Sequence, residues 1–145
     1  MGLQQLLLGT GETDNSQQAN FIDHSGTYSW VCPAGVTSVN VCCIGAGGGG
    51  GACVYKNNIS VTPGQSYTVV VGARVQNGAN SPVDGGDSYF INNTTVMAKG
   101  GQTPTSSSAS NNGGQASASV GDGKYSGGDG GNGNNGGEGG EGSGD

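Results

Sequence analysis

The sequence predicts an all-β fold of antiparallel strands, with a C-terminal glycine-rich segment of the polyglycine II type. Short runs of alternating and β-branched residues lie between Phe21 and Met97, and strong turn signals separate them. Beyond them, glycine recurs at every third position toward the C-terminus. No convincing amphipathic helix is present. These observations divide the chain into an N-terminal docking segment at 1–20, a β domain at 21–101 and a polar, glycine-rich, low-complexity segment at 102–145.

The composition is that of one domain with one modest core. The chain has 145 residues, of which 33 are glycine and only 31% are apolar, whereas average glycine usage is about 7%. Most apolar residues lie in the β domain, so we expect the packed core there. The net charge is −6, and the only basic residues are Lys56, Arg74, Lys99 and Lys124. Binding a phosphate backbone needs several converging cations, so nucleic acid is not an expected partner.

The N-terminus has neither the cationic start nor the long apolar stretch of a signal peptide, and no run approaches the roughly 20 apolar residues of a membrane span. We therefore expect neither export nor a membrane span. The opening segment contains a compact apolar patch, formed by Leu3, Leu6, Leu7 and Leu8. These leucines suit one face of a helix, but the segment is too short to be stable alone. Two interpretations stay open: it packs on its own domain as a strand or coil, or it docks the protein onto a larger assembly.

The first half of the β domain predicts three strands. "TYSWV" alternates, with Tyr28 and Trp30 on one side. "VTSVNVCCI" places Val39, Val41 and Cys43 on one face of the next strand. "ACVYKNNISV" follows as the third strand.

The second half begins with a turn and ends in a hairpin. "TPGQ" predicts a type II turn with Pro63 and Gly64 at its centre. "SYTVVVGA" is a β-branched strand, and "DSYFI" and "TTVMA" suit a hairpin across Asn92 and Asn93. Most aromatic residues lie in these strands, where core packing is the favoured interpretation: Tyr28, Trp30, Tyr55, Tyr67, Tyr89 and Phe90.

The four cysteines are Cys32, Cys42, Cys43 and Cys53. Cys42 and Cys43 are adjacent on one strand, so their side chains point to opposite faces. No C-x-x-C pair exists, and a lone His24 offers little support for a metal site. The favoured interpretation is four small core thiols. One disulfide is the next alternative, and a metal site is the least favoured.

A strict period of three marks the C-terminal tail. Glycine occupies one place of every triplet, at Gly127, Gly130, Gly133, Gly136, Gly139 and Gly142. An extended helix with three residues per turn leaves such a column bare, so neighbouring helices can approach closely and hydrogen-bond. Ordering one residue costs about 1–2 kcal/mol, and a net hydrogen bond returns only about 0.5–1.5 kcal/mol. We therefore expect the tail to be ordered by neighbouring segments, of this chain or of other copies; a floppy linker is the alternative.

The stretch "VNVCCIGAGGGG" contains a G-x-G-x-x-G pattern after a strand, as dinucleotide-binding units do. Such a unit needs a helix directly after the glycines and an acidic residue about 20 positions on. Here "GACVYKNNISVTPG" favours a strand, and no Asp or Glu lies between Asp23 and Asp84. We therefore interpret Gly45, Gly47 and Gly48 as structural glycines, not as a nucleotide site.

No cofactor, metal or catalytic site is expected, and the chain is not predicted to be an enzyme. A single histidine leaves no ordinary catalytic triad. Most carboxylates lie in the glycine-rich end, where no pocket walls would tune them. "GGEGGEGSGD" faintly resembles calcium-binding nonapeptide repeats but lacks their periodic aliphatic residue, so solvated surface carboxylates are the favoured interpretation.

Several motifs taken together resemble the glycine-rich domain of bacteriophage tail fibres and adhesins. They are "GTYSWVCPAGVTSVNVCCIGAGGGGG", "ISVTPGQSYTVVVGA", "GGDSYFI" and the glycine triplets. The motifs occur in the same order over roughly residues 26–101. The tail is similar in its glycine-rich composition. It implies a small sandwich-like β module, with glycine segments that pack as a bundle of polyglycine-type helices at the tip of a fibre. The four cysteines and the polar segment after Thr103 depart from the pattern.

The resemblance implies a structural component of a bacteriophage virion, a short tail fibre or adhesin-like appendage assembled in the host cytoplasm. Its expected partners are other virion proteins through the N-terminal segment, two further copies in a homotrimer, and a host surface receptor. The exposed loop "VQNGANSPVDGG" and residues 102–119 are the places where receptor contact is expected. A capsid decoration or head-fibre protein is the alternative, and a secreted glycine-rich carbohydrate-binding module is the second alternative.

Overall fold

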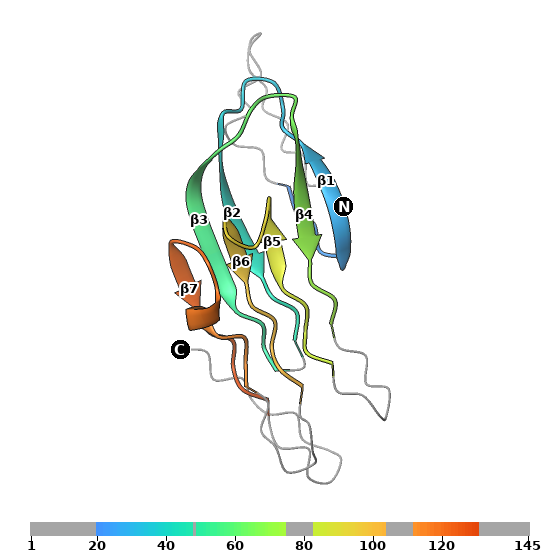
Figure 1. Ribbon diagram of the computed structural model, residues 1–145, viewed down its shortest axis with the longest axis vertical. Helices are drawn as coiled ribbons and strands as arrows, with labels where there is room; N and C mark the ends of the chain where they lie inside the picture. Colours follow the sequence, from blue (N-terminus) through green and yellow to red (C-terminus); the bar gives the residue numbers. More distant parts are fainter. Residues whose placement is uncertain (1–19, 48, 75–82, 104–111, 131–145) are drawn as a thin grey trace, which may run out of the picture.

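Two antiparallel β-sheets form the folded part of the protein, as described by a computed structural model for residues 20–47, 49–74, 83–103 and 112–130 (Figure 1). The first sheet has the strand order β1-β4-β5-β6, with β1 at Gly26–Val31, β4 at Ser66–Val71, β5 at Ser88–Phe90 and β6 at Val96–Ala98. The second has the order β2-β3-β7, with β2 at Ser38–Ile44, β3 at Cys53–Ser60 and β7 at Gly123–Tyr125. A short 3₁₀ helix, η2, spans Ala116–Ala118. The all-β prediction is confirmed.

The turn after β3 has the predicted geometry. Gly64 has φ +79°, and the amide of Gln65 donates to the carbonyl of Thr62 at 3.1 Å. A type II turn needs this positive φ at its third residue, and Pro63 supplies the fixed φ at the second. This turn reverses the chain from β3 in the second sheet into β4 in the first sheet.

The predicted hairpin joins β5 to β6, with Tyr89 opposite Met97. The side-chain oxygen of Asn92 accepts from the amides of Thr94 and Thr95 at 3.0 and 2.9 Å and holds the loop closed. Ile91, just before the loop, has φ +69°. That backbone region is unfavourable for a β-branched residue, but its amide donates to the carbonyl of Thr68 at 2.7 Å.

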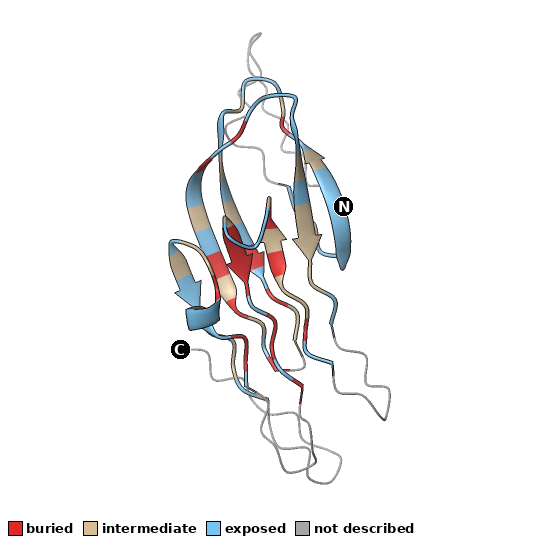
Figure 2. Ribbon diagram, in the orientation of Figure 1, coloured by how far each residue is buried: buried red, intermediate tan, exposed pale blue. Residues whose placement is uncertain are grey.

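The core lies between the two sheets and is small. Its buried members are Cys32, Cys43, Val54, Ile59, Val61, Phe90, Val96 and Ala98 (Figure 2). Along β2, Val39, Val41 and Cys43 turn inward while Cys42 and Ile44 are exposed, as the alternation predicts. Trp30, Tyr67 and Phe90 form a ring cluster with centroids 5.8–6.2 Å apart. The aromatic prediction is correct for these three, whereas Tyr28 and Tyr55 are exposed.

The thiol prediction is correct for half of the cysteines. Cys32 and Cys43 are buried core residues, but Cys42 is exposed and Cys53 is only half-buried. The reason is the period of two: a strand that buries Cys43 must turn Cys42 toward solvent.

Residues 112–130, which the sequence assigns to the low-complexity segment, belong to the same folded unit. β7 pairs with β3, and Tyr125 lies opposite Cys53. Met97 and Val120 exchange both backbone hydrogen bonds, at 2.8 and 2.9 Å. This pairing ties the edge strand β6 of the first sheet to the segment that leads into β7 of the second.

Candidate functional site

Beyond one end of the two sheets, the chain continues in extended glycine-rich segments that run side by side (Figure 1). We call this assembly the glycine lattice. Its described segments are 45–47, 49–52, 72–74, 83–87, 99–103, 112–115 and 126–130. Six of the seven segments directly precede or follow a β-strand, and 112–115 leads into η2. The sheets therefore set the positions at which most segments enter the lattice.

Backbone hydrogen bonds connect the lattice segments to one another, and every segment except 72–74 bonds to more than one other segment. Ala52 donates to Lys99 at 2.9 Å, Gly101 to Ala46 at 2.8 Å, Gly85 to Gly101 at 2.8 Å, Ala46 to Gly86 at 3.0 Å, Gly50 to Gly128 at 3.0 Å, Gly114 to Gly50 at 2.8 Å and Gly127 to Gly114 at 2.9 Å. Segment 49–52 alone thus bonds to segments 99–103, 112–115 and 126–130, whereas a strand inside a β-sheet bonds to two neighbours.

The segments lie so close together that side chains have no room between them. A Cβ on Gly45 would collide with the carbonyl oxygen of Lys99, and one on Gly100 with that of Gly85. A Cβ on Gly127 would meet the carbonyl oxygen of Gly50 in the same way. In each case the obstacle is backbone, which cannot rotate away as a side chain can. These positions therefore require glycine because of close approach.

Carboxylates serve the lattice as hydrogen-bond acceptors. Asp87 accepts from the amide of Gly100 at 2.8 Å and from the Nζ of Lys99 at 3.0 Å. Asp84 accepts from the amide of Thr103 at 3.0 Å. Asp129 accepts from the amide of Gly113 at 2.8 Å. These side chains supply partners for amides that no neighbouring carbonyl reaches.

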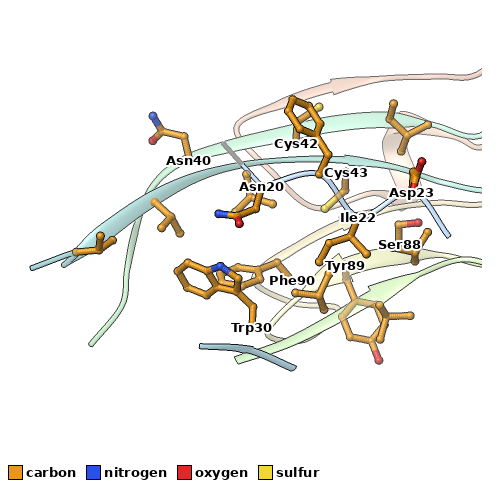
Figure 3. A pocket seen from close by; sticks show the side chains of 18 of the residues that line it. Asn20, Ile22, Asp23, Trp30, Asn40, Cys42, Cys43, Ser88, Tyr89 and Phe90 are labelled. Atoms are coloured by element: carbon orange, nitrogen blue, oxygen red, sulfur yellow. The ribbon is translucent and has the colours of Figure 1, made fainter. Parts of the chain in front are cut away.

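A cleft of about 1140 Å³ opens between the sheets. Its walls come from β2 on one sheet and from β1, β4 and β5 on the other. Figure 3 shows Trp30 and Phe90 on one side, Cys43 on the other, and Asn20 and Ile22 between them. The lining is mainly apolar, so the cleft can accept apolar side chains but presents no cluster of acid and base groups.

The titratable groups near this cleft do not form a catalytic set. Asp23 accepts from the ring of His24 at 2.7 Å, and that hydrogen bond lowers the pKa of the Asp23 carboxyl, although both side chains are exposed. Burial raises the pKa of the Cys43 thiol to about 11, which keeps it protonated and unreactive at neutral pH. Among the described residues, no group of three or more His, Cys, Asp or Glu is placed to hold a metal ion.

A family model described as "Glycine-rich domain" matches residues 22–145. The chain belongs to this glycine-rich domain family. No curated protein and no solved structure matches the chain. Within the ranges that the structure describes, this glycine-rich domain has no helix long and apolar enough to cross a membrane.

The glycines named from the sequence fall in different places. Gly45, Gly47 and Gly127 lie in the lattice where a Cβ would collide with backbone, and Gly130 lies at the end of its last described segment. The other named residues lie outside the described ranges: Leu3, Leu6, Leu7, Leu8, Gly48, Gly133, Gly136, Gly139 and Gly142. After the lattice turn the chain enters β3 at Cys53, so a strand follows the G-x-G-x-x-G pattern, as predicted.

Sequence reasoning missed most of the lattice of this glycine-rich domain. The missed positions include Gly49, Gly50, Gly51, Gly72, Gly85, Gly86, Gly100, Gly101, Gly113 and Gly114. A signal was present: glycine doublets recur at 85–86, 100–101, 113–114 and 127–128, and each lies close to a predicted strand or a polar loop. Most of the predicted structural glycines were taken from the C-terminal triplets, and these lie mainly beyond the described residues.

Proposed function

We propose that this glycine-rich domain is a non-catalytic structural component of a bacteriophage virion, a short tail fibre or adhesin-like appendage. The observation that carries the proposal is the glycine lattice, in which seven described segments hold one another through backbone hydrogen bonds and exclude side chains. The described lattice segments are packed backbone against backbone, which leaves little room for a side-chain pocket in which chemistry could be arranged. Its use is mechanical: it makes a stiff projection from a small β domain.

Two physical properties support a role outside the cell. The lattice amides and carbonyls are bonded to one another, and a protease must bind a substrate segment in extended form with those groups free. Glycine also has no side-chain entropy to lose on ordering. The multiple crosslinks between segments offset the large backbone entropy that glycine loses. The expected result is a projection that resists proteolysis.

The lattice would present its connecting segments to a host receptor. Arg74 and Val83 flank one connection, and Thr103 and Asn112 flank another. The loop "VQNGANSPVDGG" at 75–86 and residues 102–119 are the proposed receptor contacts, because loops on a rigid scaffold are suited to recognition.

Attachment to the virion would use the N-terminal segment. The proposed docking residues are Leu3, Leu6, Leu7 and Leu8, with other virion proteins as partners. A homotrimer is the proposed assembly, formed in the host cytoplasm before incorporation into the particle. The apolar cleft between the sheets supports self-association, since an open apolar surface is better covered than left in water.

A capsid decoration or head-fibre protein is the alternative within the virion. A secreted carbohydrate-binding module is the alternative from another class, and one observation favours it. Tyr55 and Tyr125 are 40% and 52% exposed on the outer face of the second sheet. Their strands are paired, so the two rings form part of one surface. Exposed aromatic rings are the usual platform for sugars.

The deciding experiment is quantitative mass spectrometry of purified particles. A few copies per particle, in a multiple of three, support a tail fibre. Many tens of copies support the decoration protein instead. Absence from particles would refute both virion proposals. The sugar-binding alternative would then be tested on a glycan array, by comparing wild type with a Tyr55→Ala, Tyr125→Ala double variant. Deletion of residues 1–12 should abolish incorporation but leave the β domain folded; normal incorporation would refute the docking role.

A further inference from the structure

Two of the four thiols lie close together on the outer face of the second sheet. The Sγ atoms of Cys42 in β2 and Cys53 in β3 are 3.9 Å apart. Cys42 is exposed and Cys53 is half-buried. The other two cysteines, Cys32 and Cys43, are buried in the core, so they are not part of this surface pair.

The sheet register explains the proximity. Cys42 lies opposite Tyr55, and Cys53 lies opposite Ile44, so the two cysteines are diagonal neighbours on adjacent strands. Diagonal neighbours in a flat sheet are about 7–8 Å apart at their Cα atoms. The right-handed twist of a sheet brings one of the two diagonals closer, and the short distance between the sulfurs identifies this diagonal as the close one.

We propose that Cys42 and Cys53 form a reversible intrachain disulfide that closes the base of the first lattice turn. The bond requires an S–S distance of about 2.05 Å, so the sulfurs must approach by roughly 2 Å. Cys42 faces solvent, and rotation about its Cα–Cβ bond moves its sulfur without displacing a core side chain. The disulfide would link the strand that enters the turn at Gly45 to the strand that leaves it at Ala52.

The chemistry needs a disulfide as oxidant, and a low-molecular-weight disulfide such as oxidised glutathione suffices. One cysteine thiolate attacks a glutathione sulfur, forms a mixed disulfide and releases one glutathione thiolate. The second cysteine thiolate then attacks the protein sulfur of the mixed disulfide and releases the second glutathione. The two protons lost by the cysteines are taken up by the two glutathione thiolates, so the protein is oxidised by two electrons and the oxidant is reduced by two.

The environment of the pair favours slow, pH-dependent closure. Burial and the neighbouring Cys53 sulfur raise the pKa of the Cys42 thiol. Since the thiolate is the attacking species, a raised pKa leaves less of it at neutral pH. Closure should therefore accelerate as the pH rises, and the pair should persist as thiols in a reducing compartment.

The disulfide would act on a very flexible part of the unfolded chain. The segment that it encloses contains glycine at 45 and 47–51, and glycine has more backbone freedom in the unfolded state than any other residue. A bridge across this segment removes part of that freedom before folding begins. We expect the oxidised protein to melt several degrees above the reduced protein.

The test uses the full chain, purified with reductant and then exposed to oxidised glutathione at mildly alkaline pH. The expected result is loss of the mass of two hydrogen atoms in the intact monomer, and a fall from four titratable thiols to two under denaturing conditions. No Lys or Arg precedes Lys56, so a tryptic digest leaves all four cysteines on one peptide. Substitution must therefore assign the bridge.

Cys42→Ser and Cys53→Ser should each prevent the mass loss and the rise in melting temperature. Cys32→Ser is the matched control and should retain both, and circular dichroism on each variant establishes that it is folded. The proposal is overturned if a folded wild-type chain keeps four thiols, stops at a glutathione adduct, or forms only disulfides between chains. A bridge that survives Cys42→Ser would overturn it as well.

Discussion

The β-sandwich and the glycine lattice are held together by different groups: side chains in the first and backbone in the second. In the β-sandwich, side chains fill the space between the sheets, as in the ring cluster of Trp30, Tyr67 and Phe90. In the glycine lattice, the space between segments is closed by backbone alone, as where Gly100 lies against Gly85. Figure 2 shows that buried residues continue from the strands into the lattice. Burial in this protein therefore depends on removing side chains in one region and on packing them in the other.

This difference implies that the two regions respond to mutation in opposite ways. The sandwich should lose stability when a side chain becomes smaller, because a cavity remains. The lattice should lose stability when a side chain becomes larger, because backbone must move apart. Three substitutions and one pH titration probe the two regions, from the largest expected effect to the smallest.

The largest effect is expected for Phe90→Ala in the core. Phe90 is buried and contacts both other rings of the cluster. Removing the ring should lower the free energy of unfolding by about 4 kcal/mol, from lost transfer energy and a residual cavity. Urea denaturation measures it. Val31→Ala, at an exposed position of β1, is the control and should change stability by less than about 1 kcal/mol. Similar losses for the two variants would show that the ring cluster is not the core.

The opposite test is Gly100→Ala in the lattice. The added methyl group would collide with the carbonyl of Gly85, and we expect a loss of about 3 kcal/mol because backbone must shift. Gly64→Ala is the matched control: a Cβ there has open space, and only its φ of +79° opposes the change, which costs about 1 kcal/mol. If thermal melting ranks the two variants equally or in the reverse order, the tight lattice is contradicted.

A smaller effect should follow loss of a lattice acceptor. Asp87→Ala leaves the buried amide of Gly100 without its partner, at an expected cost of about 2 kcal/mol. Asp87→Asn keeps one acceptor oxygen for that amide and should retain more than half of the stability that Asp87→Ala loses. Hydrogen exchange at Gly100 provides a local readout. Equal exchange rates in wild type and Asp87→Ala would show that this carboxylate does not protect the amide.

Over the first pH unit above 9, the smallest effect comes from the core thiol. Burial raises the pKa of Cys43 from 9.0 to about 11, with smaller contributions from Cys42 and Cys53. Below pH 9 both states hold the proton and the free energy of unfolding is unaffected. Between these values only the unfolded thiol ionises, so stability should fall by about 1.4 kcal/mol per pH unit. Urea denaturation of wild type and Cys43→Ala across this window measures the difference, and parallel curves would contradict it.

Local patterns in the sequence predicted most of the sandwich. The alternation in β2 predicted which of Val41, Cys42 and Cys43 face inward, because the side-chain period of a strand is two. The Pro63-Gly64 turn was equally clear, since it depends on the φ preferences of two adjacent residues. The candidate site was less predictable. The C-terminal triplets drew attention by their period, whereas the glycines that form most of the described lattice occur as isolated doublets.

The sequence by itself determined where most strands run, where the chain turns and where side chains are absent. These properties are local, and each is set by a residue and its near neighbours. Only the tertiary structure decided which glycines meet. An amide of Gly101 has no chemical preference for the carbonyl of Ala46 over any other, because every backbone group is alike. The partners are selected by the sheets, which hold the ends of the glycine segments at fixed positions and so set which backbones come within hydrogen-bonding distance.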